Sequence, residues 1–212
     1  MKVLLEGLER FRNEVYPRHR ELYATLRDAQ RPEVLFISCS DSRVVPNFQF
    51  QTLPGELFIC RNVGNIVPPW GEHTGGVSAA IEYAVRVCNV KHIVVCGHTD
   101  CGAMKAALHP ESVASMPAVS HWLKNTERAL AVVRELHGQD DAQTLGRLIE
   151  ENALAQLDHL ATHPSVAARM RAGALRLHAW VFDIANAEFT AYDPKQGRFV
   201  PLADVAADLL QE

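Results

Sequence analysis

The sequence predicts an α/β protein with a largely parallel central β-sheet flanked by helices, an N-terminal helical arm and further helical decoration. Short apolar runs at residues 34–37, 57–60 and 93–96 each suit a strand that is buried on both faces. A stretch with helical spacing, residues 74–88, separates the last two runs. Because strands that alternate with helices need crossover connections, this order predicts parallel pairing.

The first thirty residues have the pattern of two helices. Apolar residues recur at helical spacing on both sides of Pro17, which ends the first helix: Leu4, Leu8, Phe11 and Val15 before it, and Leu22, Tyr23 and Leu26 after it. We therefore expect one domain over residues 1–212, made of a helical arm (1–30) and an α/β core with helical insertions (31–212).

The second half of the chain is predicted to begin with helices and to end with strands. A short helix is expected over residues 101–108, and residues 120 to about 170 are almost entirely helical in pattern, with Pro164 and Gly173 as breaks. Three further strands are expected at residues 175–183, 187–192 and 198–201, followed by a short terminal helix.

Composition favours an ordinary globular protein. The 212 residues are 48% apolar and carry a net charge of −4, from 21 Lys and Arg against 25 Asp and Glu. This balance gives no general attraction for nucleic acid or for an anionic membrane. Charges interrupt the apolar start within a few residues, and no later stretch approaches membrane-spanning length. We expect a cytoplasmic protein with no nucleic-acid or membrane partner.

Five cysteines in such a chain favour metal binding, catalysis or burial over a disulfide framework. Cys39 lies two residues beyond the first predicted strand and His98 two residues beyond the third, with Cys101 three residues further on. Ligands of parallel α/β sheets collect beyond the carboxyl ends of the strands. The three side chains therefore meet if these strands are near neighbours.

Two thiolates and one imidazole are ligands suited to zinc. Three protein ligands leave one tetrahedral position open, as in catalytic rather than structural sites, so we expect one Zn²⁺ per subunit. The alternative is a pair of buried cysteines and a surface histidine, because a free cysteine behaves as a small apolar residue. Burial is the expected role of Cys60, Cys88 and Cys96, which lie in apolar contexts.

Asp41 and Arg43 share a short segment with Cys39, so a metal held by Cys39 lies near both. Asp41 can accept a hydrogen bond from a water on that metal, and Arg43 can hold Asp41 ionised through a charge-assisted bond. The commoner role of such a pair is a surface ion pair that caps a loop. The neighbouring ligands favour the catalytic interpretation.

The pattern Cys39-x-Asp41-x-Arg43 after one strand, with His98-x-x-Cys101-Gly102 after another, resembles the motifs of the β-class carbonic anhydrases. The resemblance covers essentially the whole chain, through residues 54–58, 61–65, 81–85 and 116–123. It is strongest for bacterial members of the plant-like branch, some of which are encoded with cyanate-degrading enzymes.

This resemblance implies reversible hydration of carbon dioxide to bicarbonate and a proton, by zinc-bound hydroxide that an Asp–Arg pair orients. Cys39, His98 and Cys101 match the zinc ligands of the family, and Asp41 with Arg43 matches its catalytic pair.

The resemblance also implies a small substrate pocket. Gln30 matches a glutamine that hydrogen-bonds substrate, Phe58 and Tyr83 match the aromatic residues that line the carbon dioxide pocket, and Gly102 is assigned to the same pocket. Without the resemblance, Gln30 would be a surface residue at a helix end, and the two aromatic residues would belong to the core. Because the family builds its site between two subunits, we expect a homodimer or a larger even homo-oligomer.

One difference from part of the family concerns inhibition. A second branch closes its site through a Trp–Arg–Tyr triad that binds bicarbonate, and the matching positions here are Phe36, Arg61 and Phe182. Only the arginine is kept, so we expect the inhibitory site to be absent. His73 and His121 are candidates for carrying the proton away, although a surface histidine without that role is commoner.

Two other functions fit the same residues. One is a carbon disulfide hydrolase on the same scaffold, and the other is a non-catalytic zinc-binding module, which would hold metal without turnover. A thiol redox role is weaker, because the chain has no Cys-x-x-Cys.

Overall fold

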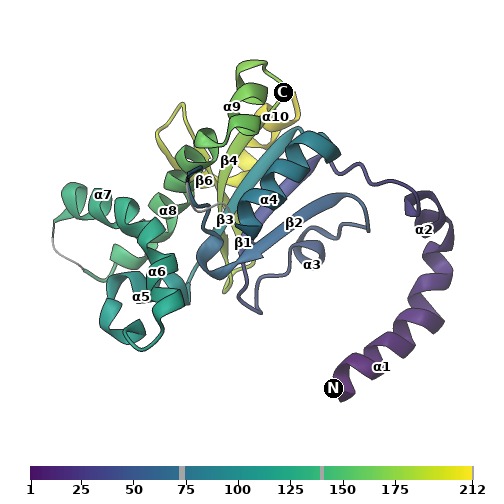
Figure 1. Ribbon diagram of the computed structural model, residues 1–212. Helices are drawn as coiled ribbons and strands as arrows, with labels where there is room; N and C mark the ends of the chain where they lie inside the picture. Colours follow the sequence, from purple (N-terminus) through teal and green to yellow (C-terminus); the bar gives the residue numbers. More distant parts are fainter. Residues whose placement is uncertain (72–74, 139–140, 212) are drawn as a thin grey trace.

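A six-stranded sheet with the order β2-β1-β3-β4-β5-β6 forms the centre of the molecule (Figure 1). The computed structural model describes residues 1–71, 75–138 and 141–211. Strands β1 to β4 pair in parallel, while β5 and β6 are added antiparallel at one edge. The strands are β1 (Val34–Cys39), β2 (Leu57–Asn62), β3 (His92–His98), β4 (Arg176–Asp183), β5 (Glu188–Asp193) and β6 (Arg198–Pro201). The predicted fold class, a largely parallel sheet flanked by helices, is confirmed.

The helices lie on both faces of the sheet, at its end and in the N-terminal arm. Their bounds are α1 (Lys2–Arg10), α2 (Arg20–Leu26), α3 (Pro46–Phe50), α4 (Gly76–Tyr83), α5 (Gly102–Leu108), α6 (Pro117–Leu123), α7 (Glu127–His137), α8 (Thr144–Thr162), α9 (Pro164–Arg171) and α10 (Leu202–Gln211). Helix α4 continues as a π-helical turn, Ala84–Cys88. Thr74, where the sequence predicts this helix to begin, and His73 lie outside the described residues.

The alternation of side chains along β1 divides the core into two layers. Leu35 and Ile37 pack with α4, α8 and α9 on one face. Phe36 points to the other face, where it meets Phe50 of α3 and Trp180 of β4. Because both faces are covered, the strand is apolar at successive positions, which is why its sequence is an unbroken apolar run.

A third apolar cluster covers the carboxyl end of the parallel strands. It joins α5, α7 and α8 to Ile66, and it contains both Cys39 and Cys101. The register sets this end of the sheet, since Ser38 pairs with Arg61 of β2 on one side and with Cys96 of β3 on the other. The ends of β1 and β3 are therefore adjacent.

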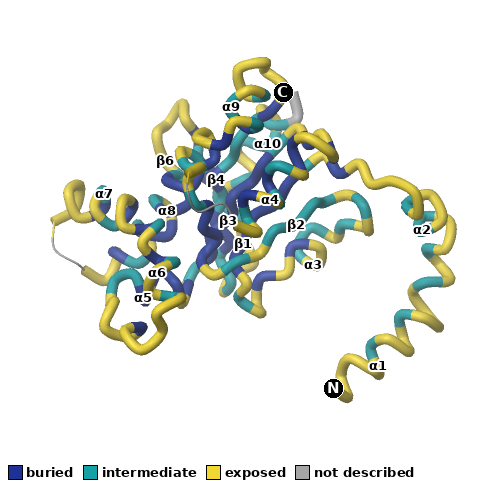
Figure 2. The backbone as a smooth tube through the Cα atoms, in the orientation of Figure 1, coloured by how far each residue is buried: buried dark blue, intermediate teal, exposed yellow. Residues whose placement is uncertain are grey.

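The N-terminal arm projects away from the sheet, and its residues are exposed or half-buried (Figures 1 and 2). None of residues 2–26 is buried. Pro17 lies in a 3₁₀ turn, Tyr16–His19, that separates the two predicted helices. Large apolar side chains stand open to solvent on α1: Val3, Leu4, Leu5 and Leu8. Among the described residues, no helix combines the length and apolar character needed to cross a membrane.

Candidate metal centre

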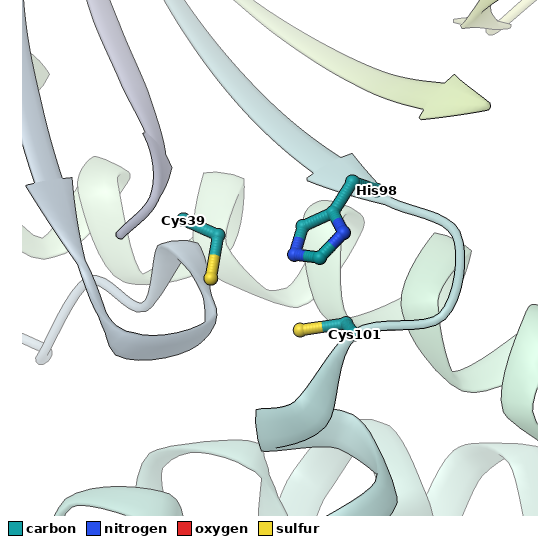
Figure 3. A group of neighbouring side chains, drawn as sticks. All are labelled: Cys39, His98 and Cys101. Carbon is teal, nitrogen blue, oxygen red and sulfur yellow. The ribbon is translucent and has the colours of Figure 1, made fainter. Parts of the chain in front are cut away.

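Three side chains meet beyond the carboxyl ends of β1 and β3 (Figure 3). Cys39 is the last residue of β1, His98 is the last residue of β3, and Cys101 immediately precedes α5. Between the last two, Asp100 adopts a left-handed conformation with φ of 61°, which turns the chain back toward the sheet. One ligand atom from each residue lies within 4.8 Å of the other two.

Burial and an unpaired nitrogen make this cluster fit a metal ion. The exposed fractions of Cys39, His98 and Cys101 are 6%, 0% and 1%. The Nδ1 atom of His98 donates to the carbonyl of Thr99 at 2.9 Å, since a carbonyl can only accept. This bond leaves Nε2 as the acceptor, and that buried atom has no hydrogen-bond partner among the described residues. In metal sites, a hydrogen bond from the other ring nitrogen in this way orients a histidine ligand.

The donor set and its spacing suit zinc. Tetrahedral zinc with sulfur at about 2.3 Å and nitrogen at about 2.0 Å separates its ligands by about 3.5–4 Å. The observed 4.8 Å limit is within a small side-chain adjustment of that value. Cys39, His98 and Cys101 are therefore the residues that could hold one zinc ion, with a tetrahedral position left for solvent or substrate.

The two thiols of the cluster differ in acidity. The pKa of Cys39 is lowered, chiefly by the neighbouring thiol of Cys101 and further by the adjacent ring of His98 and by the backbone N–H of Gly64, which donates to the Cys39 sulfur at 3.4 Å. The pKa of Cys101 is raised by the adjacent Cys39 sulfur and by burial. A bound cation removes that conflict by favouring both thiolates. Elsewhere, burial raises the pKa of Cys60, Cys88 and Cys96, which keeps them as thiols.

Gly64 is a structural partner of the cluster that sequence reasoning missed. Its φ of 80° lies in the left-handed region, and a Cβ there would come within 2.9 Å of the Ala103 Cβ. Both constraints require glycine. The tight loop brings the Gly64 N–H onto the sulfur of Cys39. The sequence does show Gly64 in an Asn-Val-Gly-Asn stretch, but that turn signal alone does not point to a thiolate.

Asp41 and Arg43 form a bidentate pair next to the cluster. The guanidinium Nε and Nη2 atoms donate to Oδ1 and Oδ2 of Asp41 at 2.9 Å and 2.8 Å, and the backbone N–H of Arg43 donates to Oδ1 at 3.0 Å. These bonds to Arg43 hold the pKa of Asp41 well below its usual range. Its Oδ2 atom lies 3.9 Å from Nε2 of His98, so the carboxylate borders the metal-binding atoms.

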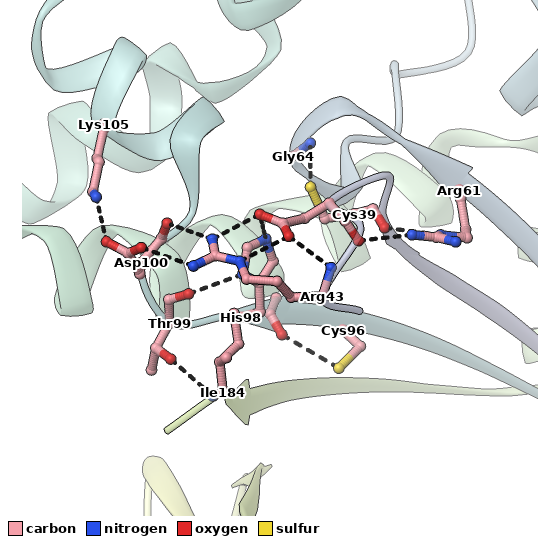
Figure 4. Close-up of polar contacts among 12 residues, drawn as sticks. Cys39, Arg43, Arg61, Gly64, Cys96, His98, Thr99, Asp100, Lys105 and Ile184 are labelled. Atoms are coloured by element: carbon pink, nitrogen blue, oxygen red, sulfur yellow. Dashed lines mark hydrogen bonds and ion pairs between the residues drawn. The ribbon is translucent and has the colours of Figure 1, made fainter. Parts of the chain in front are cut away.

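The polar network extends from Arg43 across to the loop between His98 and Cys101. Nη1 of Arg43 donates to Oδ2 of Asp100 at 3.0 Å, and Lys105 pairs with the other oxygen of the same carboxylate. Acidic and basic groups thus alternate from Asp41 through Arg43 and Asp100 to Lys105, and Figure 4 labels the last three. Asp100 is the second residue here that the sequence did not single out.

The predicted substrate residues do not all lie near their own chain's cluster. Phe58 pairs with Leu35, whereas Cys39 pairs with Asn62, so four strand positions, or about 13 Å, separate the two levels. Tyr83 stacks on Phe58 with ring centroids 5.9 Å apart. Gln30 shares with Tyr83 a surface cavity of about 600 Å³ next to the start of β1, at the opposite end of that strand from Cys39.

Gly102, by contrast, directly follows Cys101 and starts α5. One chain therefore brings together Cys39, Asp41, Arg43, His98 and Cys101 with Gly102, but leaves Gln30, Phe58 and Tyr83 at the opposite end of the sheet.

The residues at the expected triad positions have structural contacts of their own. Arg61 donates to the carbonyls of Cys39 and Asp41 at 3.1 Å and 2.8 Å, which fixes the chain as it leaves β1. Phe36 and Phe182 are buried in one apolar cluster. His121 is exposed on α6.

Comparisons with known proteins give a consistent result. The family model for carbonic anhydrase matches residues 34–189. The carbonic anhydrase of Pseudomonas aeruginosa is 46% identical over 204 residues, which cover 96% of this chain and 93% of that protein. The solved β-carbonic anhydrase CcaA matches with a TM-score of 0.91 and 41% identity, covering 95% of this chain and 98% of that one. A tetrameric β-carbonic anhydrase of Sordaria macrospora matches with a TM-score of 0.77 and 28% identity over 90% and 95% of the two chains.

Proposed function

Since this chain belongs to the β-carbonic anhydrase family and is an enzyme of that kind, we propose that it hydrates carbon dioxide at the Cys39–His98–Cys101 cluster. The products are bicarbonate and a proton, and the reaction is reversible. The observation that carries the proposal is the buried, unpaired Nε2 of His98 facing two cysteine sulfurs within 4.8 Å. Buried polar atoms are rarely left without a partner, and a zinc ion would supply one here.

Zinc in such a site supplies a water of lowered pKa, near 7, as the nucleophile at neutral pH. The carboxylate of Asp41, which borders the cluster, would accept a hydrogen bond from such a water and so orient it. The carboxylate can do this throughout the neutral range because its pKa is lowered by the bonds from Arg43. Arg43 holds both carboxylate oxygens and keeps Asp41 in one rotamer.

The substrate pocket, in this proposal, is completed by a second copy of the chain. Gln30, Phe58 and Tyr83 lie about 13 Å or more of strand length from their own Cys39, so they can serve only another copy's cluster. The exposed apolar face of α1 is a surface that a second copy would bury. The family's assembly as an even oligomer agrees with this arrangement, and a tetrameric relative has the same fold.

Two further points belong to the proposal. The Trp–Arg–Tyr inhibitory triad is absent, because Phe36 and Phe182 lack a polar group and the guanidinium of Arg61 is already bonded to two carbonyls. The protein acts in the cytoplasm, where a reducing environment preserves the two thiolates that the zinc needs.

The test is the Asp41→Asn variant, in which the amide retains the size of the side chain but not its charge. We expect zinc content to stay at the wild-type level and the hydration rate to fall by about 100-fold or more, measured by stopped flow. Asp158→Asn is the matched control, since it also removes the carboxylate of an Asp–Arg pair, here with Arg128 at 2.6 Å on the surface. It should keep the wild-type rate.

The alternatives predict different outcomes. A non-catalytic zinc module would bind zinc without turnover in the wild type. A carbon disulfide hydrolase would turn over that substrate faster than carbon dioxide. If Asp41→Asn hydrates carbon dioxide at the wild-type rate, the assigned role of Asp41 is wrong.

A further inference from the structure

Asp100 lies in the three-residue step between the ligands His98 and Cys101, and its side chain faces Arg43 rather than solvent alone (Figure 4). The two residues are 57 positions apart in the sequence. Their bond therefore links the segment after β1, which carries Asp41, to the loop after β3, which carries two of the three ligands.

The guanidinium of Arg43 is held from two sides. Nε and Nη2 bind Asp41, while Nη1 binds Oδ2 of Asp100 at 3.0 Å. Nη2 also approaches the backbone carbonyl of Asp100 at 3.4 Å. A bidentate pair that is held only by its own segment can swing as a unit, whereas a second anchor on another element fixes the plane of the guanidinium and of the carboxylate.

The loop that provides this anchor is itself rigid. Thr99 donates its hydroxyl to Asp183 at 3.2 Å and accepts the backbone N–H of Ile184 at 3.0 Å. Its own N–H donates to the carbonyl of Phe182 at 2.9 Å. Lys105, one helical turn into α5, balances the charge of Asp100. Asp100 is thus presented to Arg43 from a fixed position.

Position matters here because Asp41 borders the metal-binding atoms. Its Oδ2 lies 3.9 Å from Nε2 of His98, so a short rotation would bring the carboxylate onto a cation at the cluster, to which it is attracted. Ion pairs at the surface hold weakly, and the Arg43 side chain is 43% exposed. The Asp41–Arg43 pair alone is therefore a weak restraint against that attraction.

We propose that Asp100 is a positioning residue: by anchoring Arg43 it keeps the Asp41 carboxylate beside the metal site and prevents it from turning onto the metal. This inference rests on the proposed function, because it gives Asp41 its role toward the nucleophilic water. In this role Asp100 acts through Arg43 and not by touching the cluster atoms or the substrate.

The test compares Asp100→Gly with Asp100→Asn. Glycine accepts the left-handed φ of 61° and so preserves the loop while removing the anchor. Asparagine also tolerates this conformation, and its side-chain oxygen can still accept a hydrogen bond from Nη1 of Arg43. Lys105→Gln is the control, since it removes the neighbouring charge and leaves the Asp100–Arg43 bond in place.

We expect Asp100→Gly to keep the wild-type zinc content and to lose about tenfold in kcat, with KM for carbon dioxide nearly unchanged, because only the positioning of Asp41 is disturbed. The visible spectrum of the cobalt(II)-substituted protein should change in Asp100→Gly, since a carboxylate that joins the metal alters its coordination. Asp100→Asn should recover most of kcat and the wild-type spectrum, and Lys105→Gln should retain both within about twofold.

A wild-type kcat and cobalt spectrum in Asp100→Gly would overturn the inference. A loss of kcat only in proportion to lost zinc would also overturn it, since Asp100 would then act through the stability of the ligand loop. The proposed function is tested separately: if Asp41→Asn is slow while Asp100→Gly is not, only this inference fails, whereas a fast Asp41→Asn removes the premise.

Discussion

Thr99, the residue that follows His98, orients the imidazole for the ligand role proposed above. The Thr99 carbonyl accepts a hydrogen bond from Nδ1 of His98, which leaves Nε2 unprotonated, and Thr99 is in turn bonded to the end of β4. The cost of burying an unpaired nitrogen is offset only when a cation binds there. The same atom is therefore a source of instability without metal and of affinity with it.

The Cys39→Ser variant tests the ligand role at this scale. A serine hydroxyl ionises far less readily than a thiol and is a poor zinc ligand, so we expect zinc content to fall from about one per chain to near zero after dialysis. Hydration activity should be lost with the metal. The measurement is elemental analysis beside the stopped-flow rate.

Cys60→Ser provides the matched control for that variant. Cys60 also lies on a strand, but burial raises its pKa and it packs in the apolar layer under α4. It should keep zinc and activity. Full zinc occupancy in Cys39→Ser would contradict the ligand assignment.

Among single residues, the sequence predicts those that lie at the ends of the buried strands. Cys39 and His98 were expected to meet because each follows a buried apolar run, and the structure brings both together with Cys101. Their role as ligands stays a prediction, as does that of Asp41 with Arg43. Asp100 and Gly64 could not be predicted, because their contributions depend on a left-handed backbone and on contacts between segments far apart in sequence.

At the scale of elements, the 3₁₀ turn Val63–Asn65 after β2 closes one side of the cluster. The turn is held by Asn62, whose side chain bonds the backbone N–H and the carbonyl of Ile66, and by Trp122 of α6, whose indole N–H donates to the carbonyl of Val63 at 2.7 Å. A turn fixed from two elements holds the Gly64 N–H against the sulfur of Cys39.

Gly64→Ala should therefore damage both fold and site. A left-handed alanine costs about 1–2 kcal/mol, and its Cβ would meet Ala103 at 2.9 Å, so we expect a loss of about 2 kcal/mol or more in the free energy of unfolding. Zinc affinity should fall as well, because the N–H bond to Cys39 moves. Urea unfolding and competition with a chelator measure the two effects.

Gly146→Ala makes the same change where nothing opposes it. Gly146 is exposed near the start of α8, and a Cβ there would touch nothing. This variant should gain up to about 1 kcal/mol through better helix propensity. If Gly64→Ala were equally stable, the turn would not be under the constraint described.

Element types were predictable where packing and periodicity agree. The runs at 34–37, 57–60 and 93–96 lie within β1, β2 and β3, and 198–201 coincides with β6. The ends differ by one or two residues, because ladder hydrogen bonds continue into the polar ends such as Cys39 and His98. The π-helical turns at Phe11–Val15 and Ala84–Cys88 have no pattern of their own in the sequence.

At the scale of the whole molecule, stability should depend on pH through a histidine outside the site. His178 of β4 lies with its Nε2 3.0 Å from Nδ1 of His92 on β3, and burial, with a smaller contribution from His92 and Arg176, lowers its pKa to about 4. The folded protein therefore disfavours protonation of His178, whereas in the unfolded chain the same histidine binds a proton near pH 6.5. Stability is retained above pH 6.5 and falls as the pH drops toward 4.

His178→Gln removes this titration. Between pH 7.5 and pH 5, the wild type should lose about 2 kcal/mol more than the variant in the free energy of unfolding, measured by urea denaturation. His109→Gln, at a side chain that is 69% exposed, should follow the wild type. Parallel curves for wild type and His178→Gln would show that His178 does not carry the effect.

The apolar periodicity of the sequence says least about how copies of the chain assemble. Strand periodicity specifies which residues are buried within one copy, but it gives no role to the exposed leucines of α1 or to Gln30, which lies in a surface cavity away from the cluster. Only the family resemblance gave them a role, and that role stays a prediction, as do the division into arm and core and the plant-like branch. The pocket must nevertheless be made from separated parts, because β1 is a rigid spacer between Gln30 and Cys39.

A mixed dimer tests this arrangement directly. Cys39→Ser lacks a ligand but keeps Gln30 and Tyr83, whereas the Gln30→Ala/Tyr83→Ala double variant keeps the ligands but lacks the pocket residues. If each site takes its ligands from one copy and its pocket from the other, a dimer with one chain of each kind contains one native site and should reach about half of the wild-type rate. The two chains are co-expressed with different tags, purified through both, and assayed beside each parental dimer, with sedimentation confirming that all remain assembled. A mixed dimer no faster than the mean of its parents would mean that each chain builds its pocket alone, which the separation along β1 does not permit without a different fold.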